Sequence, residues 1–207
     1  MIHIKHVLAL VSAAGLSSAL AGCAVNGAGP EETLGQSTEA ISTDVCPAGV
    51  PVALAPAADQ TLKSTLTGVG VQIYTCAATP AGGFAWTLVG PQANLLNDEG
   101  KLVGTHFIGP TWQGNDGSSV VGAKKAAASV DASAVPWLRL DAVSHSAEDG
   151  RFSDVTTIQR LSTVGGLAPA DGCDVAHAGS ISQIPYTAQY VFYRVKDHGN
   201  VKQCNGS

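Results

Sequence analysis

The chain has 207 residues, of which 45% are hydrophobic, 5% are aromatic and 13% are charged. Its 24 glycines and 10 prolines predict frequent turns, and its formal net charge is −5. This composition excludes a coiled coil, a collagen, a highly charged disordered chain and a nucleic-acid-binding protein that depends on basic charge. The length allows one domain with terminal appendages.

Residues 1–22 predict an export signal of the lipoprotein type. Lys5 precedes an apolar stretch, residues 7–20, that is too short to span a bilayer as a helix but has the length of a signal-peptide core. The stretch ends in Leu20-Ala21-Gly22-Cys23, which resembles the lipobox of bacterial lipoproteins. The resemblance implies cleavage before Cys23 and a lipid on that cysteine. The alternative is an ordinary secretory signal in which the cysteine falls there by chance.

Residues 23–44 predict a flexible acidic tether in front of a single domain, residues 45–207. The tether has no aromatic or basic residue, so it cannot bury enough apolar surface to offset its chain entropy. By resemblance to lipoprotein sorting in enterobacteria, Ala24 in place of Asp favours the outer membrane. We therefore expect an exported protein that is held at the bacterial cell envelope through Cys23. Its acidic balance argues against nucleic acid and against basic contacts with anionic lipid.

Four cysteines remain in the predicted domain, and an even number in an exported chain indicates two disulfides. Three connectivities are open. The favoured one pairs Cys46 with Cys204 and Cys76 with Cys173, because it ties down both ends of the domain and cross-links its middle. Zinc is the alternative, but the chain has no C-x-x-C pair to support it.

The domain predicts β-strands throughout. Segments rich in β-branched and aromatic residues alternate with turn residues, and the predicted strands are 71–76, 84–89, 94–96, 102–108, 119–130, 137–143, 155–161 and 188–195. About seven to nine strands at this spacing are typical of an antiparallel β-sandwich or barrel with little helix.

Two segments compete as helices by propensity. Residues 57–66 have moderate helix propensity, and residues 123–134 are rich in alanine. For the second segment we favour a strand in its first half, because the residues alternate out of an Asn-Asp-Gly turn. Residues 97–104 and 115–122 also resemble one another at a spacing of 18 residues. We interpret this echo as two hairpin turns, with a functional repeat as the alternative.

The densest group of polar and aromatic residues lies in residues 104–118. One interpretation is a ligand site in which Trp112 stacks on a sugar or other ring, while His106, Gln113 and Asp116 form hydrogen bonds. The other interpretation places Trp112 in the core and the remaining residues in a bend and a turn. This is the candidate binding site of the sequence.

Catalytic patterns are weaker. Ser118, His106 and Asp116 are the residue types of a hydrolase triad, but no G-x-S-x-G elbow presents the serine. Paired carboxylates of a glycosidase have candidates in Asp116, Asp141 and Asp154, with nothing to specify their separation.

Cofactor and metal signals are weaker still. The sequence Gly68-Val69-Gly70 begins like a dinucleotide-binding loop but lacks the third glycine and precedes a predicted strand. The histidines show no H-x-H or H-E-x-x-H spacing, and too few acids gather around Asn115 and Asp116 for calcium. We expect neither a bound metal nor a cofactor.

Several motifs resemble a known family: GVQIYTC at 70–76, the block from 84 to 122, VPWLRL at 135–140, VTTIQR at 155–160, GGLAPADGC at 165–173 and IPYTAQYVFYR at 184–194. They are similar to the secreted bacterial and fungal family catalogued as domain of unknown function 3455. The resemblance covers most of residues 45–195 and implies no established activity. Some fungal relatives carry the label malate dehydrogenase, but this chain lacks a nicotinamide-binding fingerprint, so we do not expect a dehydrogenase.

Together these observations predict an exported, lipid-anchored binding module for a small ligand or a carbohydrate. The alternatives are a hydrolase that uses His106 and Asp116, or a purely structural envelope protein. The sequence leaves the ligand and the oligomeric state open.

Overall fold

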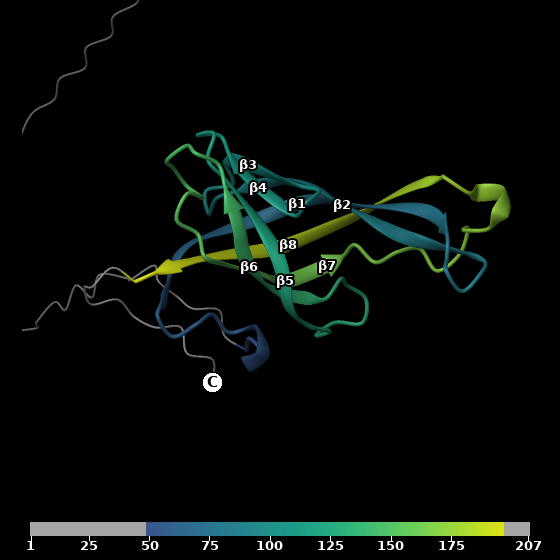
Figure 1. The fold of residues 1–207 in the computed structure, drawn as a ribbon, viewed down its shortest axis with the longest axis horizontal. Coiled ribbons are helices and arrows are strands. Elements are labelled where there is room, and N and C mark those ends of the chain that lie inside the picture. The colour runs from purple at the N-terminus through teal and green to yellow at the C-terminus, as the bar shows by residue number, and fades with distance from the viewer. Residues whose placement is uncertain (1–48, 197–207) are drawn as a thin grey trace, which may run out of the picture. The chain divides into compact units, whose positions relative to one another are not determined.

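The computed structural model describes residues 49–196, which form eight antiparallel strands and two short 3-10 helices (Figure 1). In chain order the elements are η1 (Val52–Leu54), β1 (Gln60–Ala78), β2 (Phe84–Leu96), β3 (Leu102–Phe107), β4 (Thr111–Gly114), β5 (Ser119–Ala128), β6 (Trp137–His145), β7 (Thr157–Gly165), η2 (Val175–His177) and β8 (Ile181–Val195). Each strand pairs with the next along the chain, and β1 also pairs with β8, so the sheet closes into a barrel. The all-β prediction is confirmed. Of the two predicted architectures, a sandwich or a barrel, the structure has the barrel.

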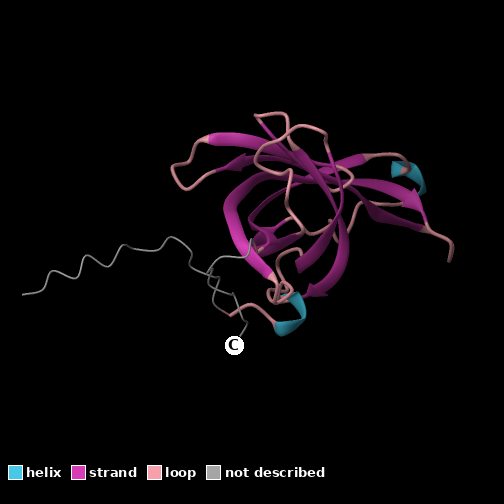
Figure 2. Cartoon of the chain, turned by 60° about the vertical axis from the view of Figure 1, so that its left-hand side comes forward, coloured by secondary structure: helices cyan, strands magenta, loops and turns pink. Residues whose placement is uncertain are grey.

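The predicted signal segment and tether lie outside the described residues, as do Cys23, Cys46 and Cys204. The predictions made for them stay predictions. Within residues 49–196, no helix is long and apolar enough to cross a membrane. The helices of this part of the chain are the two 3-10 turns shown in Figure 2.

β1 explains the glycines that begin like a dinucleotide-binding loop. Both lie inside the strand, where no helix follows them. A Cβ atom on Gly68 would lie 2.5 Å from Cε2 of Tyr190, and one on Gly70 would lie 2.1 Å from the carbonyl oxygen of Gln92. These two positions therefore need glycine because a ring and a neighbouring strand approach the backbone there.

One end of the barrel is filled by the loop between β6 and β7, and we call it the closed end. Phe152 and Val155 of this loop are fully buried and join the core cluster of the barrel interior. The ring centroids of Phe152 and Phe192 are 5.0 Å apart. The backbone N–H of Phe152 donates a hydrogen bond to Ser118 Oγ at 3.0 Å, which ties the loop to the β4–β5 turn.

We call the opposite end the open end. There β1, β2 and β8 continue past the other strands as an arm (Figure 1). The disulfide Cys76–Cys173, with a Cα–Cα distance of 5.3 Å, attaches the β7–β8 loop to β1. This bond confirms the predicted pairing of these two cysteines. In the chain-entropy model, a cross-link across about a hundred residues stabilises a fold by about 4–5 kcal/mol.

A second hydrophobic cluster lies on the outer face of the barrel wall. Leu54 of η1 packs there with Leu161, Val191 and Tyr193. Gln159 fixes this contact, because its Nε2 donates to the carbonyl of Leu54 at 2.6 Å and its Oε1 accepts from the Tyr193 hydroxyl at 2.8 Å. As a consequence, residues 157–159 of β7 and 190–193 of β8 are buried on both faces of the sheet.

The structure corrects the predicted elements in three places. The helical alternative for residues 57–66 is wrong, because β1 begins at Gln60 and pairs with β8 from its first residue. Residues 84–96 form the single strand β2, where the sequence predicted two strands. The short strand β4 (Thr111–Gly114) was not predicted at all.

Other expectations hold. Residues 119–128 form the strand β5, in agreement with the preference for a strand in the first half of the alanine-rich segment. The echo between residues 97–104 and 115–122 corresponds to two hairpin turns. One is closed by a hydrogen bond from Gly100 N to Asn97 O at 2.8 Å, and the other by one from Gly117 N to Gly114 O at 3.1 Å.

Candidate functional site

The strongest candidate site is a cavity of about 190 Å³ at the open end of the barrel. Its polar lining comes from three strands, with Gln72 on β1, His106 on β3 and Arg160 on β7. The rest of the lining is apolar or backbone: Leu88, Val89, Gly90, Pro91, Gly109 and Pro110. The cavity is smaller than the roughly 300–1,000 Å³ that hold drug-sized ligands, so it suits a small molecule or one end of a larger one.

Arg160 brings a largely buried positive charge to this cavity. Its side chain shares a face of β7 with the core residue Ile158, two positions earlier. Nε and Nη2 donate to the carbonyl oxygen of Pro136 at 3.2 and 2.9 Å. Within residues 49–196, no Asp or Glu forms an ion pair with Arg160. Burial lowers the pKa of Arg160, but a guanidinium keeps its proton in proteins, so the charge stays uncompensated.

Three tyrosines lie close enough to Arg160 to interact with it electrostatically. The hydroxyl of Tyr74 donates to the carbonyl of Gly166 at 2.6 Å, and the hydroxyls of Tyr186 and Tyr190 are 3.1 Å apart. Burial raises the pKa of all three phenols. They therefore stay neutral at physiological pH and do not balance the charge of the guanidinium.

Gln72 adds a donor that the fold leaves unused. Its side chain is 1% exposed, and its Nε2 has no hydrogen-bond partner within the described residues. Leaving a buried amide without an acceptor costs roughly 1–3 kcal/mol. Gly166 packs tightly over this side chain, since a Cβ there would lie 3.1 Å from Cγ of Gln72, and its φ of +80° also favours glycine. A ligand oxygen in the cavity is the natural acceptor for Gln72.

His106 is a neutral ring in the wall of the cavity. Its side chain is 3% exposed, and Nδ1 donates to the carbonyl of Thr111 at 2.8 Å. Burial is the main reason that its pKa falls to about 3. The positive charge of Arg160 acts in the same direction, and the hydrogen bond to Thr111 opposes both. The ring stacks on Trp112 at a centroid distance of 4.3 Å and an interplanar angle of 11°.

The sequence predicted a site of His106, Trp112, Gln113 and Asp116, and the structure brings only the first two together. Trp112 is 1% exposed, and its ring packs edge-on against Tyr190 and Phe192 in the barrel core. Gln113 follows it on β4 and is exposed on the opposite face of the strand. Of the four residues, only His106 lines the cavity at the open end.

Asp116 lies in the β4–β5 turn at the closed end, where it organises the backbone. Its carboxylate accepts hydrogen bonds from the N–H and Oγ of Ser118, at 3.0 and 2.7 Å, and from the N–H of Arg151 at 2.8 Å. Although burial opposes the change, these hydrogen bonds lower the pKa of Asp116. Within the described residues, no hydrogen bond joins Asp116 to His106, the pair that the hydrolase alternative needs.

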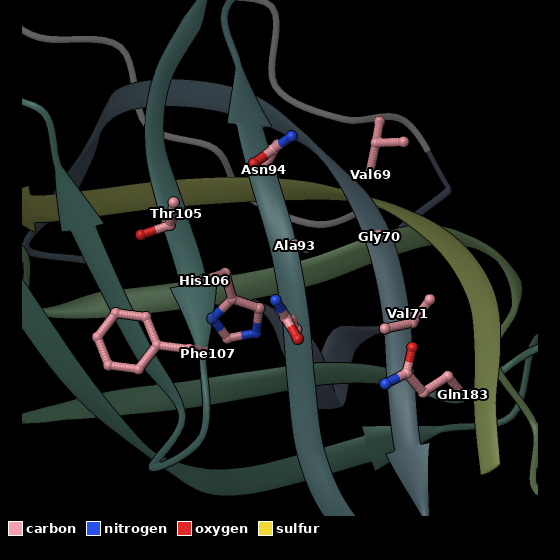
Figure 3. A pocket seen from close by; sticks show the side chains of 10 residues that line it. Val69, Gly70, Val71, Ala93, Asn94, Thr105, His106, Phe107 and Gln183 are labelled. Carbon is pink, nitrogen blue, oxygen red and sulfur yellow. The ribbon is translucent and has the colours of Figure 1, made fainter.

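A second hollow, of about 520 Å³, lies on the outer face of β1, β2 and β3 (Figure 3). We call it the outer groove. It carries no charged side chain, and its exposed polar groups are those of Gln92, Asn94, Thr105 and Gln183. Val69, Val71 and Phe107 supply its apolar surface. The groove is more open than the cavity, and among the described residues none of its lining side chains has a buried polar atom without a partner.

Metal binding finds no support in the described residues. Among residues 49–196, no three His, Cys, Asp or Glu side chains are grouped so that they could hold a metal ion. The close pair His177 Nδ1 and Asp174 Oδ1, at 2.7 Å, belongs to the start of η2, where Asp174 also caps two backbone N–H groups.

Residues 56–194 match the model of a family described as a protein of unknown function, DUF3455. The match spans more than half of the chain and agrees with the resemblance seen in the sequence. The chain belongs to this family. No curated protein and no solved structure matches it. The function of this DUF3455 protein therefore has to be argued from its own geometry.

Arg160, Gln72 and the tyrosines were missed as site residues of this DUF3455 domain. One signal was present for Arg160, because it stands two residues after Ile158 and a strand places such residues on the same face. No comparable signal marks Gln72, whose burial depends on the closure of β1 against β8. The burial of the tyrosines on β8 likewise depends on this closure.

Proposed function

We propose that the domain binds a small anionic ligand at the open end of the barrel, with the guanidinium of Arg160 as its main contact. The observation that carries this proposal is the largely buried guanidinium whose hydrogen bonds within residues 49–196 go to one backbone carbonyl. Buried charges in proteins are normally paired, because an unpaired charge in a low dielectric is costly. An anionic ligand would supply the missing charge and an acceptor for Gln72.

The chemistry around Arg160 supports binding rather than hydrolysis. The neighbouring phenols and the His106 ring are neutral, so they do not compete with a ligand for the guanidinium. Charge-assisted hydrogen bonds are roughly twice as strong as neutral ones, so even a small anion gains affinity here. The hydrolase alternative needs Asp116, whose carboxylate is already engaged with Ser118 and Arg151 in the turn.

The anion proposal is tested by thermal shift and calorimetry on the full chain at constant ionic strength. The probes are acetate, benzoate and inorganic phosphate, with acetamide and benzamide as neutral counterparts. A ligand at a hundred times its dissociation constant stabilises by about 2.7 kcal/mol. We expect at least one anion to shift the melting temperature while its neutral counterpart does not.

The matched variants are Arg160→Gln and Arg139→Gln. Both arginines donate to a backbone carbonyl, but Arg139 Nη1 bonds Ala55 on the outside of the barrel. We expect R160Q to lose at least tenfold in anion affinity and R139Q to keep it. Equal affinity in R160Q and the wild type would refute the proposal.

Uncharged carbohydrate in the outer groove is a second candidate, favoured by its three carboxamides and its lack of charge (Figure 3). Carboxamides and hydroxyls both donate and accept, as sugar hydroxyls do. A neutral sugar that shifts the melting temperature of the wild type and of R160Q, but not of Asn94→Ala, would favour this candidate over the anion site.

We also propose that the chain is exported and held at the cell envelope by a lipid on Cys23. The lipobox-like sequence supports this, and the disulfide Cys76–Cys173 fits an oxidising compartment. Cys23→Ser should move the protein from the membrane fraction to the soluble fraction. A variant that stays membrane-bound would contradict the anchor.

A further inference from the structure

The mouth of the cavity is apolar, in contrast to its interior. Leu88 and Val89 line the cavity and are 53% and 40% exposed. Ile108, in the β3–β4 connection, is 58% exposed and packs against Gly90, where its Cα and Cβ lie 3.1 Å from the position a Cβ would take. We call Leu88, Val89 and Ile108 the rim.

Single exposed hydrophobic residues are common and need no explanation. The rim differs because Leu88 and Val89 line a cavity that also holds Arg160 and Gln72, and Ile108 adjoins this lining at Gly90. Within residues 49–196, the charge of Arg160 has no ion-pair partner and Nε2 of Gln72 has no hydrogen-bond partner. A ligand that satisfies both parts has a charged end and an apolar end. A purely polar anion would leave the rim in water.

The guanidinium also indicates the shape of the charged end. Arginine has five N–H donors, and the contacts to Pro136 engage Nε and Nη2, which leaves both N–H groups of Nη1 and one of Nη2. Two such parallel donors match the two oxygens of a carboxylate. The single negative charge of a carboxylate balances one guanidinium, whereas a phosphate dianion would bring a second charge into a site whose other groups are neutral.

We propose that the ligand is an amphiphilic carboxylate, with its carboxylate on Arg160 and Gln72 and its aliphatic tail over the rim. This inference rests on the proposed anion site and adds the identity of the head group and the tail. The cavity of about 190 Å³ accommodates the head group and the first carbons, and the exposed rim contacts the rest of the tail.

The test is a chain-length series on the full chain, from acetate to octanoate, measured by calorimetry at constant ionic strength. Complete burial of one methylene corresponds to about a fourfold gain in affinity, and partial burial at the rim gives a smaller gain for each methylene. We expect affinity to rise about two- to fourfold for each added methylene over the middle of the series. Hexanamide should bind at least tenfold more weakly than hexanoate, because it lacks the charge.

The rim is tested with Leu88→Ser combined with Val89→Ser. Both side chains are exposed, so the double variant is expected to fold. It should flatten the chain-length series, so that the loss of affinity is larger for octanoate than for acetate. The control is Val143→Ser on β6, which is 62% exposed and does not line the cavity.

The outcomes separate the two proposals. A flat series in the wild type, with acetate binding that R160Q abolishes, would overturn the amphiphile and leave the anion site standing. A rising series that the double rim variant does not change would overturn the rim as the tail site. Tighter binding of hexyl phosphate than of heptanoate would overturn the carboxylate. If no carboxylate binds, this inference is overturned, whether or not inorganic phosphate binds. If no anion of any kind binds, both proposals are overturned.

Discussion

The two ends of the barrel interior differ in what their side chains do for the fold. At the closed end, Phe152 and Val155 are fully buried among aromatic and aliphatic residues, and the polar groups of Ser118 and Asp116 are hydrogen bonded. At the open end, the interior holds the charge of Arg160, which has no ion-pair partner in the part of the chain that the structure describes. The closed end thus stabilises the barrel, whereas the open end holds a guanidinium and an amide N–H that no side chain of residues 49–196 pairs with.

The same contrast appears between two arginines on neighbouring strands. Arg139 on β6 donates to the carbonyl of Ala55 at 3.0 Å and lies 3.6 Å from a carboxylate oxygen of Asp141. It holds the segment before β1 against the outer wall, with an anion close by. Arg160 on β7 also bonds a backbone carbonyl, but no carboxylate of residues 49–196 forms an ion pair with it. The role of Arg139 is therefore structural, and it serves as the control for Arg160.

The largest effect is expected at the closed end. Replacing Phe152 by Ala removes a fully buried ring from its contact with Phe192 and should lower the free energy of unfolding by about 3–5 kcal/mol. Chemical denaturation measures the loss, and Phe152→Leu is the milder variant if the alanine variant does not fold. In the folded variant, anion affinity should match the wild type. A loss below about 1 kcal/mol would show that the loop does not close this end.

A pH effect of intermediate size is expected at the open end. His106 stays neutral in the folded protein down to a pKa of about 3, whereas in the unfolded chain it gains a proton below about 6.5. The unfolded state therefore binds more protons between these values, and stability falls as the pH is lowered. Between pH 7 and pH 5 this amounts to about 2 kcal/mol.

Asparagine at position 106 keeps a side-chain N–H for the carbonyl of Thr111 and cannot titrate. Urea denaturation of the wild type and of His106→Asn at pH 7 and pH 5 isolates the contribution of the histidine, because losses of packing appear at both pH values. The wild type should lose about 2 kcal/mol more than the variant over this range. Equal losses would mean that the ring is not held neutral by burial.

The smallest effect is expected at the turn of Asp116. Replacing Asp116 by Ala removes the acceptor for Ser118 and for the N–H of Arg151, which should cost about 1–2 kcal/mol because the turn is partly solvated. Anion affinity should not change. If the variant had wild-type stability but no longer bound the anion, Asp116 would be a binding residue. The two ends of the barrel would then not have separate roles.

Counting the cysteines leaves three connectivities open, and the pairing of Cys76 with Cys173 is favoured among them because it cross-links the middle of the domain. The all-β class could be predicted from sequence, because period-2 alternation is a local signal. The strand β4 could not. It has four residues, and Trp112 is its only large apolar side chain, between residues typical of turns. The start of β1 was also ambiguous, because residues 60–66 form a strand only through their pairing with β8.

The sequence could not single out Arg160 for a related reason. Ile158, Gln159 and Leu161 are all at most 1% exposed, because the outer face of β7 is covered by Leu54 and its neighbours. Alternation places Arg160 on the same face as Ile158, but with both faces of this part of the strand buried it does not tell which face lies toward the barrel interior. The stretch 104–118 has a high density of polar and aromatic residues, but most of these residues belong to the core or to the turn.

The most direct measurement is a crystal structure of the full chain soaked with 4-bromobenzoate, with anomalous scattering from the bromine to locate the ligand. We predict carboxylate density on the guanidinium of Arg160 and a bromine peak at the rim beside Leu88 and Val89. A bromine peak only in the outer groove beside Asn94, with an empty cavity at Arg160, would contradict an anion site at the open end of the barrel.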